Sequence, residues 1–172
     1  MERQKLSRPR GRITARQVDR GPEVPQLLKW LELAGFPVAQ DAARFSIFTW
    51  PQHWEADRPL DRRVLKAAAA DAARLAEEVE KRRPLLLFFV SAQLLDAANL
   101  PEVLEALEPV LTHPAEPVRR ITDLRLRVTA QRWVKALCFG LPMPRKTFTP
   151  ETEETIAAGI AAIFRREELL PG

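Results

Sequence analysis

Hydrophobic and polar positions follow different periods along the chain, and one stretch has no polar position at all. The run Leu85–Val90 is apolar throughout and is bounded by Pro84 and Ser91. It is far shorter than the roughly 20 apolar residues that a membrane span requires. Its Leu, Phe and Val residues favour a strand that is buried on both faces. We therefore expect a central, parallel strand at this position.

Helical spacing marks three further segments. The apolar positions of residues 27–34 share one face of a short helix, and Gly35 supplies its C-terminal end. A longer helix is predicted over residues 59–83, with a proline in its first turn and Pro84 directly after it. Thr149 starts a C-terminal helix that extends nearly to Leu170.

Shorter patterns predict two further strands and a helix in the remaining chain. Partial alternation predicts a strand over residues 44–50, and the mostly apolar segment 133–141 predicts another. Asn99 has the position of an N-cap for a helix that continues to about Leu107 or Leu111. Together with the run at residues 85–90, these elements have the mixed order that is typical of α/β proteins.

Residues 118–132 fit two interpretations. Residues 124–130 alternate as in a strand, whereas Thr122 could cap a helix that places Leu126, Ala130 and Trp133 on one face. We favour the helix.

These elements predict an α/β fold: a three-layer sandwich in which a small, mostly parallel sheet is flanked by helices. With 172 residues and 46% hydrophobic content, the chain can bury one core. Residues 1–25 contain breakers and almost no large apolar side chains, which is typical of a flexible arm. We expect this basic arm to precede a single domain over residues 26–172.

The positive charge is unevenly distributed. Residues 1–20 have a net charge of +5, and residues 21–172 have a net charge of −1. Within the latter, residues 119–146 contain eight Lys and Arg side chains against Asp123 alone. The sequence therefore predicts two basic regions, the arm and this later segment.

Several kinds of site are excluded by composition and motif. Cys138 is the one cysteine, and it cannot form an internal disulfide or a CxxC metal site. Neither a glycine-rich phosphate loop nor a GxSxG, HExxH or EF-hand pattern is present. We expect no metal and no cofactor. The charged residues 1–20 do not resemble a secretory signal, so we expect a cytoplasmic protein without a membrane partner.

Candidate chemistry depends on where the predicted strands end. His53 lies between Trp50 and Trp54, whose indoles could stack on a base or a cation. If the strands are parallel, the edge at their carboxyl ends would also gather Ser91, Gln93, Arg145 and Lys146. A catalytic residue in this chain would be His53. The alternative is that both tryptophans pack into the body and His53 is a solvated loop residue.

The order of elements in the second half of the chain permits one comparison. A strand with a small-residue exit and a helix, followed by a strand, a proline-containing loop and a helix, is similar to the second half of uracil-DNA glycosylase-like folds. The loop here is Leu141–Arg145, which lacks the histidine of that family's His-Pro-Ser loop, and no water-activating aspartate motif lies upstream. The resemblance implies at most a related scaffold that is used for binding.

We therefore expect a non-catalytic binding subunit of a complex that handles nucleic acid. Its partner would be DNA, RNA or an acidic protein. The alternatives are a small hydrolase or glycosylase-like enzyme and a pure protein-interaction module. The residues expected to contact nucleic acid are Arg3, Lys5, Arg8, Arg10, Arg12, Arg16, Arg125, Arg127, Arg132, Arg145 and Lys146, with Trp50 and Trp54 as aromatic contacts.

Overall fold

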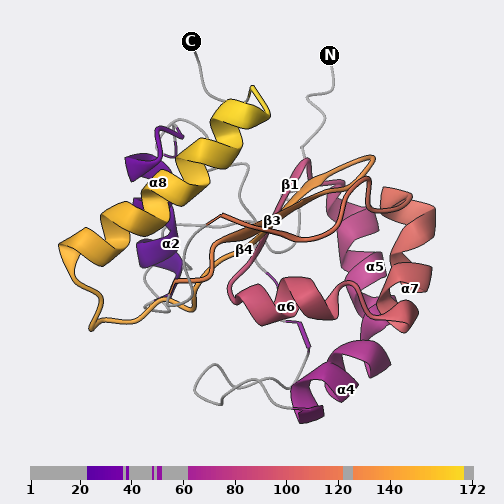
Figure 1. The fold of residues 1–172 in the computed structure, drawn as a ribbon. Helices are drawn as coiled ribbons and strands as arrows, with labels where there is room; N and C mark the ends of the chain where they lie inside the picture. Colours follow the sequence, from indigo (N-terminus) through magenta and orange to yellow (C-terminus); the bar gives the residue numbers. More distant parts are fainter. Residues whose placement is uncertain are drawn as a thin grey trace, which may run out of the picture.

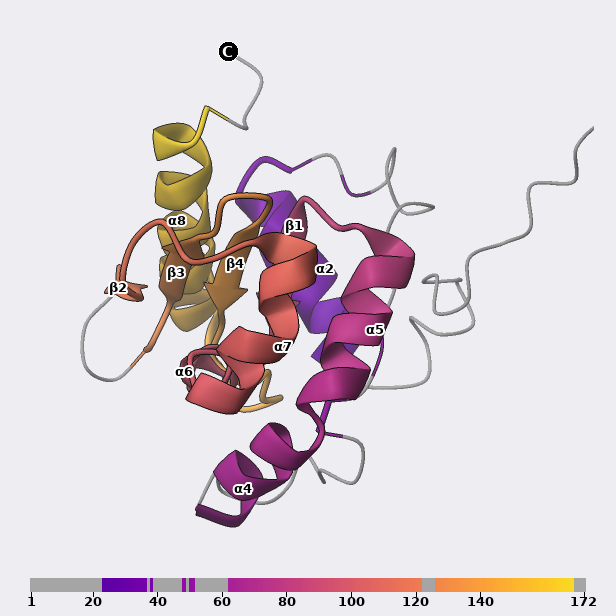
Figure 2. The same cartoon turned by 90° about the vertical axis from the view of Figure 1, so that its right-hand side faces the viewer.

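The computed structural model describes residues 23–36, 38, 48, 50–51, 62–121 and 126–168. Helices α2 and α8 lie on one side of a four-stranded sheet, and α5, α6 and α7 lie on the other (Figures 1 and 2). The α/β class is therefore confirmed. The elements are α2 (Glu23–Leu33), α4 (Arg62–Ala70), α5 (Ala72–Arg82), β1 (Leu86–Phe89), α6 (Ala92–Ala97), α7 (Pro101–Leu111), β2 (Arg119–Arg120), β3 (Thr129–Arg132), β4 (Leu137–Gly140) and α8 (Pro150–Arg166).

The sheet is mixed, with the strand order β1-β4-β3-β2. β1 and β4 are parallel, whereas β3 runs antiparallel to both β4 and β2. The expectation of a mostly parallel sheet is therefore wrong for the described strands. The cause is the short connection between β3 and β4, in which the amide of Trp133 donates to the carbonyl of Ala136 at 2.8 Å. So tight a turn can only join antiparallel neighbours, because a parallel crossover needs a dozen or more residues.

The apolar run does form a strand, but β1 is at an edge of the described sheet rather than at its centre. Leu86 and Phe88 pack against the cluster on the α2 and α8 side, and Leu87 and Phe89 against the cluster on the other side. Helices cover both faces, so neither set of side chains needs to be polar. An uninterrupted apolar run thus indicates two covered faces and does not specify the position of the strand within the sheet.

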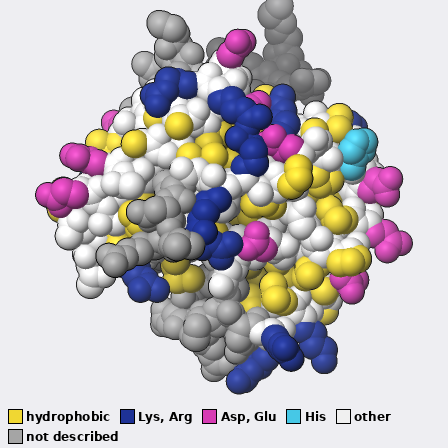
Figure 3. Space-filling view, in the orientation of Figure 1, with side chains coloured by type: hydrophobic (Ala, Val, Ile, Leu, Met, Phe, Trp, Pro, Cys, Tyr) yellow, Lys and Arg dark blue, Asp and Glu magenta, His cyan; other side chains and the backbone are white. Residues whose placement is uncertain are grey.

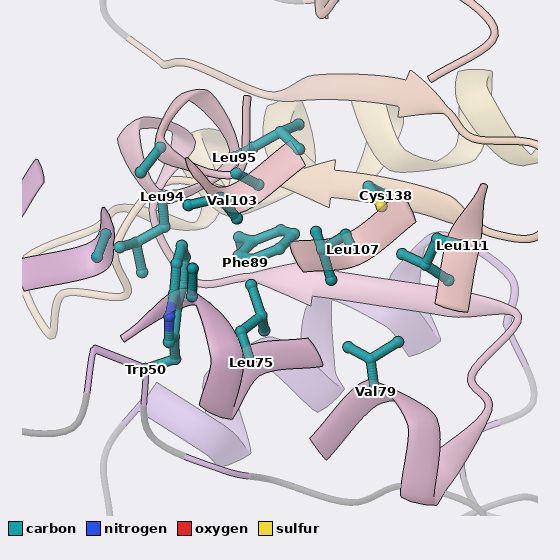
Figure 4. Close-up of a cluster of buried hydrophobic side chains, with 14 of the residues drawn as sticks. Trp50, Leu75, Val79, Phe89, Leu94, Leu95, Val103, Leu107, Leu111 and Cys138 are labelled. Atoms are coloured by element: carbon teal, nitrogen blue, oxygen red, sulfur yellow. The ribbon is translucent and has the colours of Figure 1, made fainter. Parts of the chain in front are cut away.

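Two hydrophobic clusters separated by the sheet form the core. One joins α5, α6 and α7 to Phe89 and Cys138, and Figure 4 shows these side chains meeting between the helices and the strands. The other joins α2 and α8 to Leu137 and Phe139. On that side the rings of Phe88 and Phe139 stack with centroids 4.9 Å apart.

Two helix ends agree with the sequence analysis. After α2, Gly35 has a φ of 93°, and the amide of Phe36 donates to the carbonyl of Leu31 at 2.9 Å. A residue other than glycine would be strained there. At the start of α8, the hydroxyl of Thr149 accepts from the amide of Thr152 at 3.2 Å. Both signals are local, which explains why the sequence alone revealed them.

The predicted helix over residues 59–83 is divided in two by Asp71. The carbonyl of Asp71 accepts from the indole nitrogen of Trp50 at 3.2 Å, and its carboxylate accepts from Arg74 at 3.1 Å. Asp71 has a φ of −103° and a ψ of 15°, outside regular helix geometry, although its amide still donates to the carbonyl of Ala67 at 3.0 Å. The predicted start at residues 59–61 lies outside the described residues.

Two expectations are corrected by side-chain contacts and strand pairing. Asn99 does not cap α7, because its amide group is engaged with Gln131 and with the carbonyl of Leu95. The described parts of residues 118–132 contain β2 and β3, so the preferred helix is wrong and the alternation in this segment was the better guide. The basic arm and residues 44–47 and 49 of the predicted first strand lie outside the described residues, and Phe48 and Trp50 are not in a strand.

Candidate nucleic-acid interface

The carboxyl ends of β1 and β4 lie at the same edge of the sheet, as expected for parallel strands. The register places Phe89 beside Gly140. Directly after this point the hydroxyl of Ser91 accepts from the amide of Gln93 at 3.2 Å and thereby caps α6. Ser91 is buried, whereas Gln93 is exposed. The Ser91 hydroxyl therefore stabilises the start of α6 at this edge.

Gly140 brings α6 close to this end of β4. A Cβ atom at Gly140 would lie 2.4 Å from the hydroxyl oxygen of Thr129 and 2.9 Å from the Cα of Ala92. Both distances are shorter than real Cβ contacts, and Ala92 is backbone that has no rotamer to change. The space that glycine leaves is filled by the protein itself, so it does not form a ligand cavity.

Trp50 lies near the same edge but is buried. Its side chain is part of the α5–α7 core, and its ring meets Phe89 edge-on with centroids 5.9 Å apart. Figure 4 shows the indole directed into the cluster that contains Leu75 and Leu94. For this tryptophan the structure agrees with the alternative of a packing residue, because an indole in the core presents no free face to a base.

Arg145 and Lys146 lie in the loop between β4 and α8, and both are exposed. The backbone carbonyl of Arg145 accepts from the side chain of Gln26 at 2.9 Å, which attaches the loop to α2. Neither side chain forms an ion pair with a described residue. Gln26 thus attaches this loop to α2 on one side of the sheet, whereas Ser91 caps α6 on the other side.

The other described basic residues of segment 119–146 are largely paired. Arg127 lies 2.9 Å from the carboxylate of Asp96, Arg132 lies 3.4 Å from Glu167, and Arg119 lies 3.1 Å from Glu116. On the face that Figure 3 shows, Lys and Arg side chains form a broken band with acidic groups beside it. The positive potential of this segment is therefore weaker than its sequence suggests.

Glu116 joins three elements and was not singled out by the sequence analysis. Its carboxylate lies within ion-pair distance of Arg119 and of Arg166 at 3.4 Å, and it also accepts from the amide of Arg132 at 3.1 Å. A glutamate in a proline-flanked loop is typical of a solvated surface residue, so no local signal could have identified this role.

A buried amide network lies beside this charge cluster. The side-chain carbonyl of Gln131 accepts from Asn99 at 2.8 Å and from the indole of Trp133 at 3.0 Å. Its NH₂ group donates to Asn99 and to the carbonyl of Glu116. Every hydrogen-bonding position of the Gln131 amide group thus has a partner, which is typical of a network that fixes a fold rather than of a reactive site.

Burial shifts the pKa of two titratable groups in the described part of the chain. Burial raises the pKa of the Cys138 thiol to about 12, so this thiol is neutral and unreactive at neutral pH. Burial also lowers the pKa of Arg82, which pairs with Glu78. In the described ranges no group of three His, Cys, Asp or Glu side chains is placed to hold a metal, and none of the helices there is long and apolar enough to cross a membrane.

Several predicted contact residues lie outside the described part of the chain. These are His53, Trp54, Arg125 and the arm residues Arg3, Lys5, Arg8, Arg10, Arg12 and Arg16.

Comparisons with known proteins give no match: no family model, no curated protein and no solved structure is similar to this chain.

Proposed function

We propose that this protein is a non-catalytic, cytoplasmic subunit of a complex that handles nucleic acid. It contacts DNA, RNA or an acidic partner through exposed basic side chains. The observation that carries the proposal is the exposed pair Arg145 and Lys146, which is positioned by an anchored loop and has no described acidic partner. Arginine and lysine without an internal partner are available to neutralise phosphates.

Arg127 and Arg132 contribute to the same surface charge in this proposal. Their ion pairs are partly solvated, with 39% and 46% of the two arginine side chains exposed. Exposed pairs contribute only about 0 to 1 kcal/mol each, so a phosphate can replace the carboxylate at little cost. Contacts of this kind position a protein on a backbone and carry no sequence information, so we expect binding that depends on salt more than on sequence.

Charge substitutions in the β4–α8 loop test the proposal. The double variant Arg145→Ala with Lys146→Ala is titrated with a fluorescent mixed-sequence duplex and with single-stranded DNA and RNA at several salt concentrations. Loss of two phosphate contacts should reduce the log–log salt slope on duplex by about 1.8. The melting curve should be unchanged, because exposed substitutions usually stay within about 0.5 kcal/mol.

The matched control is Arg62→Ala with Lys66→Ala. These two residues are also exposed and basic, but they lie on α4, which Figure 1 places far from the β4–α8 loop. The control should keep the affinity and slope of the wild type. Equal losses in both double variants would mean that only the total charge matters, and unchanged binding by the loop variant would refute this interface.

A further inference from the structure

The β4–α8 loop presents an exposed hydroxyl directly after the basic pair Arg145 and Lys146. The amide of Phe148 donates to the carbonyl of Arg145 at 3.1 Å, which closes a β-turn. Lys146 and Thr147 occupy the two central positions of this turn. Thr147 is exposed, and its hydroxyl forms no hydrogen bond with a described residue. Modification of this hydroxyl would therefore break no contact of the described fold.

The two other exposed threonines near this loop have different surroundings. The hydroxyl of Thr149 accepts from the amide of Thr152 at 3.2 Å and donates to its hydroxyl at 3.1 Å, so it is occupied as the cap of α8. The hydroxyl of Thr155 donates to the carbonyl of Glu151 at 2.9 Å, and the two residues before Thr155 are glutamates. Of these three exposed threonines, Thr147 alone combines a hydroxyl without a described partner with basic residues before it.

The backbone of this loop can open without disturbing a helix or a strand. Residues 142–148 belong to neither kind of element, and the bond between Phe148 and Arg145 is the one described backbone hydrogen bond among them. Few hydrogen bonds mean a small free-energy cost of local opening. Pro142 and Pro144 favour an extended chain before the turn. The segment can therefore enter the active site of a modifying enzyme in an extended form.

We propose that Thr147 is a phosphorylation site for a serine/threonine kinase that recognises basic residues before its target. The hydroxyl oxygen of Thr147 forms a bond to the γ-phosphorus of a nucleoside triphosphate, and the bond from that phosphorus to the bridging oxygen breaks. The nucleoside diphosphate leaves, and the hydroxyl proton passes to the catalytic base of the kinase. Arg145 and Lys146 supply the positive charges that acidic groups of such a kinase select.

Phosphorylation regulates the interface at Arg145 and Lys146, and this consequence rests on the function proposed above. A phosphothreonine carries a charge of about −1.5 to −2 at pH 7, which offsets most of the positive charge of the pair. Its oxygens are also strong acceptors for the two basic side chains beside it. Neither side chain is then available to a nucleic acid. The phosphorylated protein should therefore bind duplex DNA as the double variant Arg145→Ala with Lys146→Ala does.

Phosphorylation of the full-length protein without nucleic acid is the first test. The probe is a purified kinase domain that prefers arginine two residues before its target, with ATP, and mass spectrometry locates the phosphate. We expect phosphate at Thr147, none at this position in Thr147→Val, and unchanged incorporation at Thr147 in the matched control Thr155→Val. The rate at Thr147 should fall several-fold in the double variant Arg145→Ala with Lys146→Ala. No phosphate at Thr147, or an equal rate without the basic pair, would overturn the proposal.

Titration with the mixed-sequence duplex is the second test. Kinase treatment of the wild type should reduce the log–log salt slope by about 1.8, and phosphatase treatment should restore it. Kinase-treated Thr147→Val should bind as the untreated protein does, because phosphate at other positions would not reach the pair. Equal slopes of treated and untreated wild type, or an equal loss in Thr147→Val, would overturn the regulatory role. Absence of binding by the untreated protein would refute the interface itself, whereas the first test scores the modification without nucleic acid.

Discussion

Glu153 is a carboxylate buried in the first turn of α8, and its contacts explain why it is tolerated there. It accepts from the indole of Trp30 at 3.0 Å and from Lys29 at 3.3 Å. A negative charge is also favourable near the amino end of a helix. Three separate interactions thus compensate the loss of hydration, and together they attach α2 to α8.

Removing this acceptor should destabilise the fold. In Glu153→Ala the indole N–H of Trp30 would remain buried without a partner, which costs about 1 to 3 kcal/mol. The control is Glu154→Ala, which changes an exposed glutamate in the same turn and should stay within about 0.5 kcal/mol of the wild type. Urea denaturation measures both. If the two variants are equally stable, the contact between Trp30 and Glu153 does not hold the helices together.

Cys138 provides a prediction about pH. Burial penalises the thiolate and raises the pKa of Cys138 from an ordinary value of 9.0 to about 12 in the folded protein. Between these two values the unfolded chain has lost the proton and the folded chain has kept it. Stability from this group is therefore complete below pH 9 and declines as the pH rises toward 12.

Two measurements check the state of this thiol. At pH 8 a disulfide reagent should label Cys138 only as fast as the protein unfolds, and labelling should be complete in denaturant. In Cys138→Ala the decline of stability above pH 9 should be shallower than in the wild type, although the smaller side chain lowers stability at every pH. Rapid labelling of the folded protein would contradict the buried position.

Helix ends that depend on nearby residues were predictable from the sequence, whereas those that depend on contacts with distant residues were not. The stop at Gly35 and the cap at Thr149 are formed within a few residues, and both were predictable. The carbonyl of Asp71, where the predicted helix divides, accepts from Trp50, and the side chain of Asn99 bonds to Gln131, 32 residues away, instead of capping α7. Neither partner is visible in the local pattern.

The same reasoning applies to the candidate site. Exposure of Arg145 and Lys146 agrees with their place in a proline-rich loop, whereas pairing of Arg132 with Glu167 depends on where α8 ends against the sheet. The sequence also did not show that β1 lies at an edge of the described sheet. An apolar run indicates that both faces of a strand are covered, but it does not indicate which strands lie beside it. Packing between distant elements therefore determines how many basic side chains of residues 119–146 form ion pairs within the protein.

Substitutions in β1 should show that its two faces contribute differently to the stability of the fold. Phe89 is 8% exposed and contacts Trp50, so Phe89→Ala should cost about 3 to 5 kcal/mol. Phe88 is only half-buried and stacks on Phe139, so Phe88→Ala should cost less. Chemical denaturation of the two variants checks the order. Two neutral substitutions would mean that β1 contributes little to the core.

Positive charge is distributed unevenly over the whole molecule. The described body pairs many of its basic side chains internally, while residues 1–20 have a net charge of +5. Each phosphate neutralised on duplex DNA contributes a log–log salt slope of about −0.9. If the protein is a nucleic-acid-binding subunit, the arm should supply the larger part of this slope and Arg145 and Lys146 a smaller part.

The most direct measurement is the salt dependence of duplex and single-strand binding by the full chain and by residues 21–172. We expect the full chain to bind with a steep negative slope, and we expect removal of residues 1–20 to weaken binding and flatten the slope without changing the melting curve. Residual binding by the shorter chain should still depend on Arg145 and Lys146. Absence of binding by the full chain at low salt, or identical slopes for the two chains, would contradict a nucleic-acid-binding role of the basic residues.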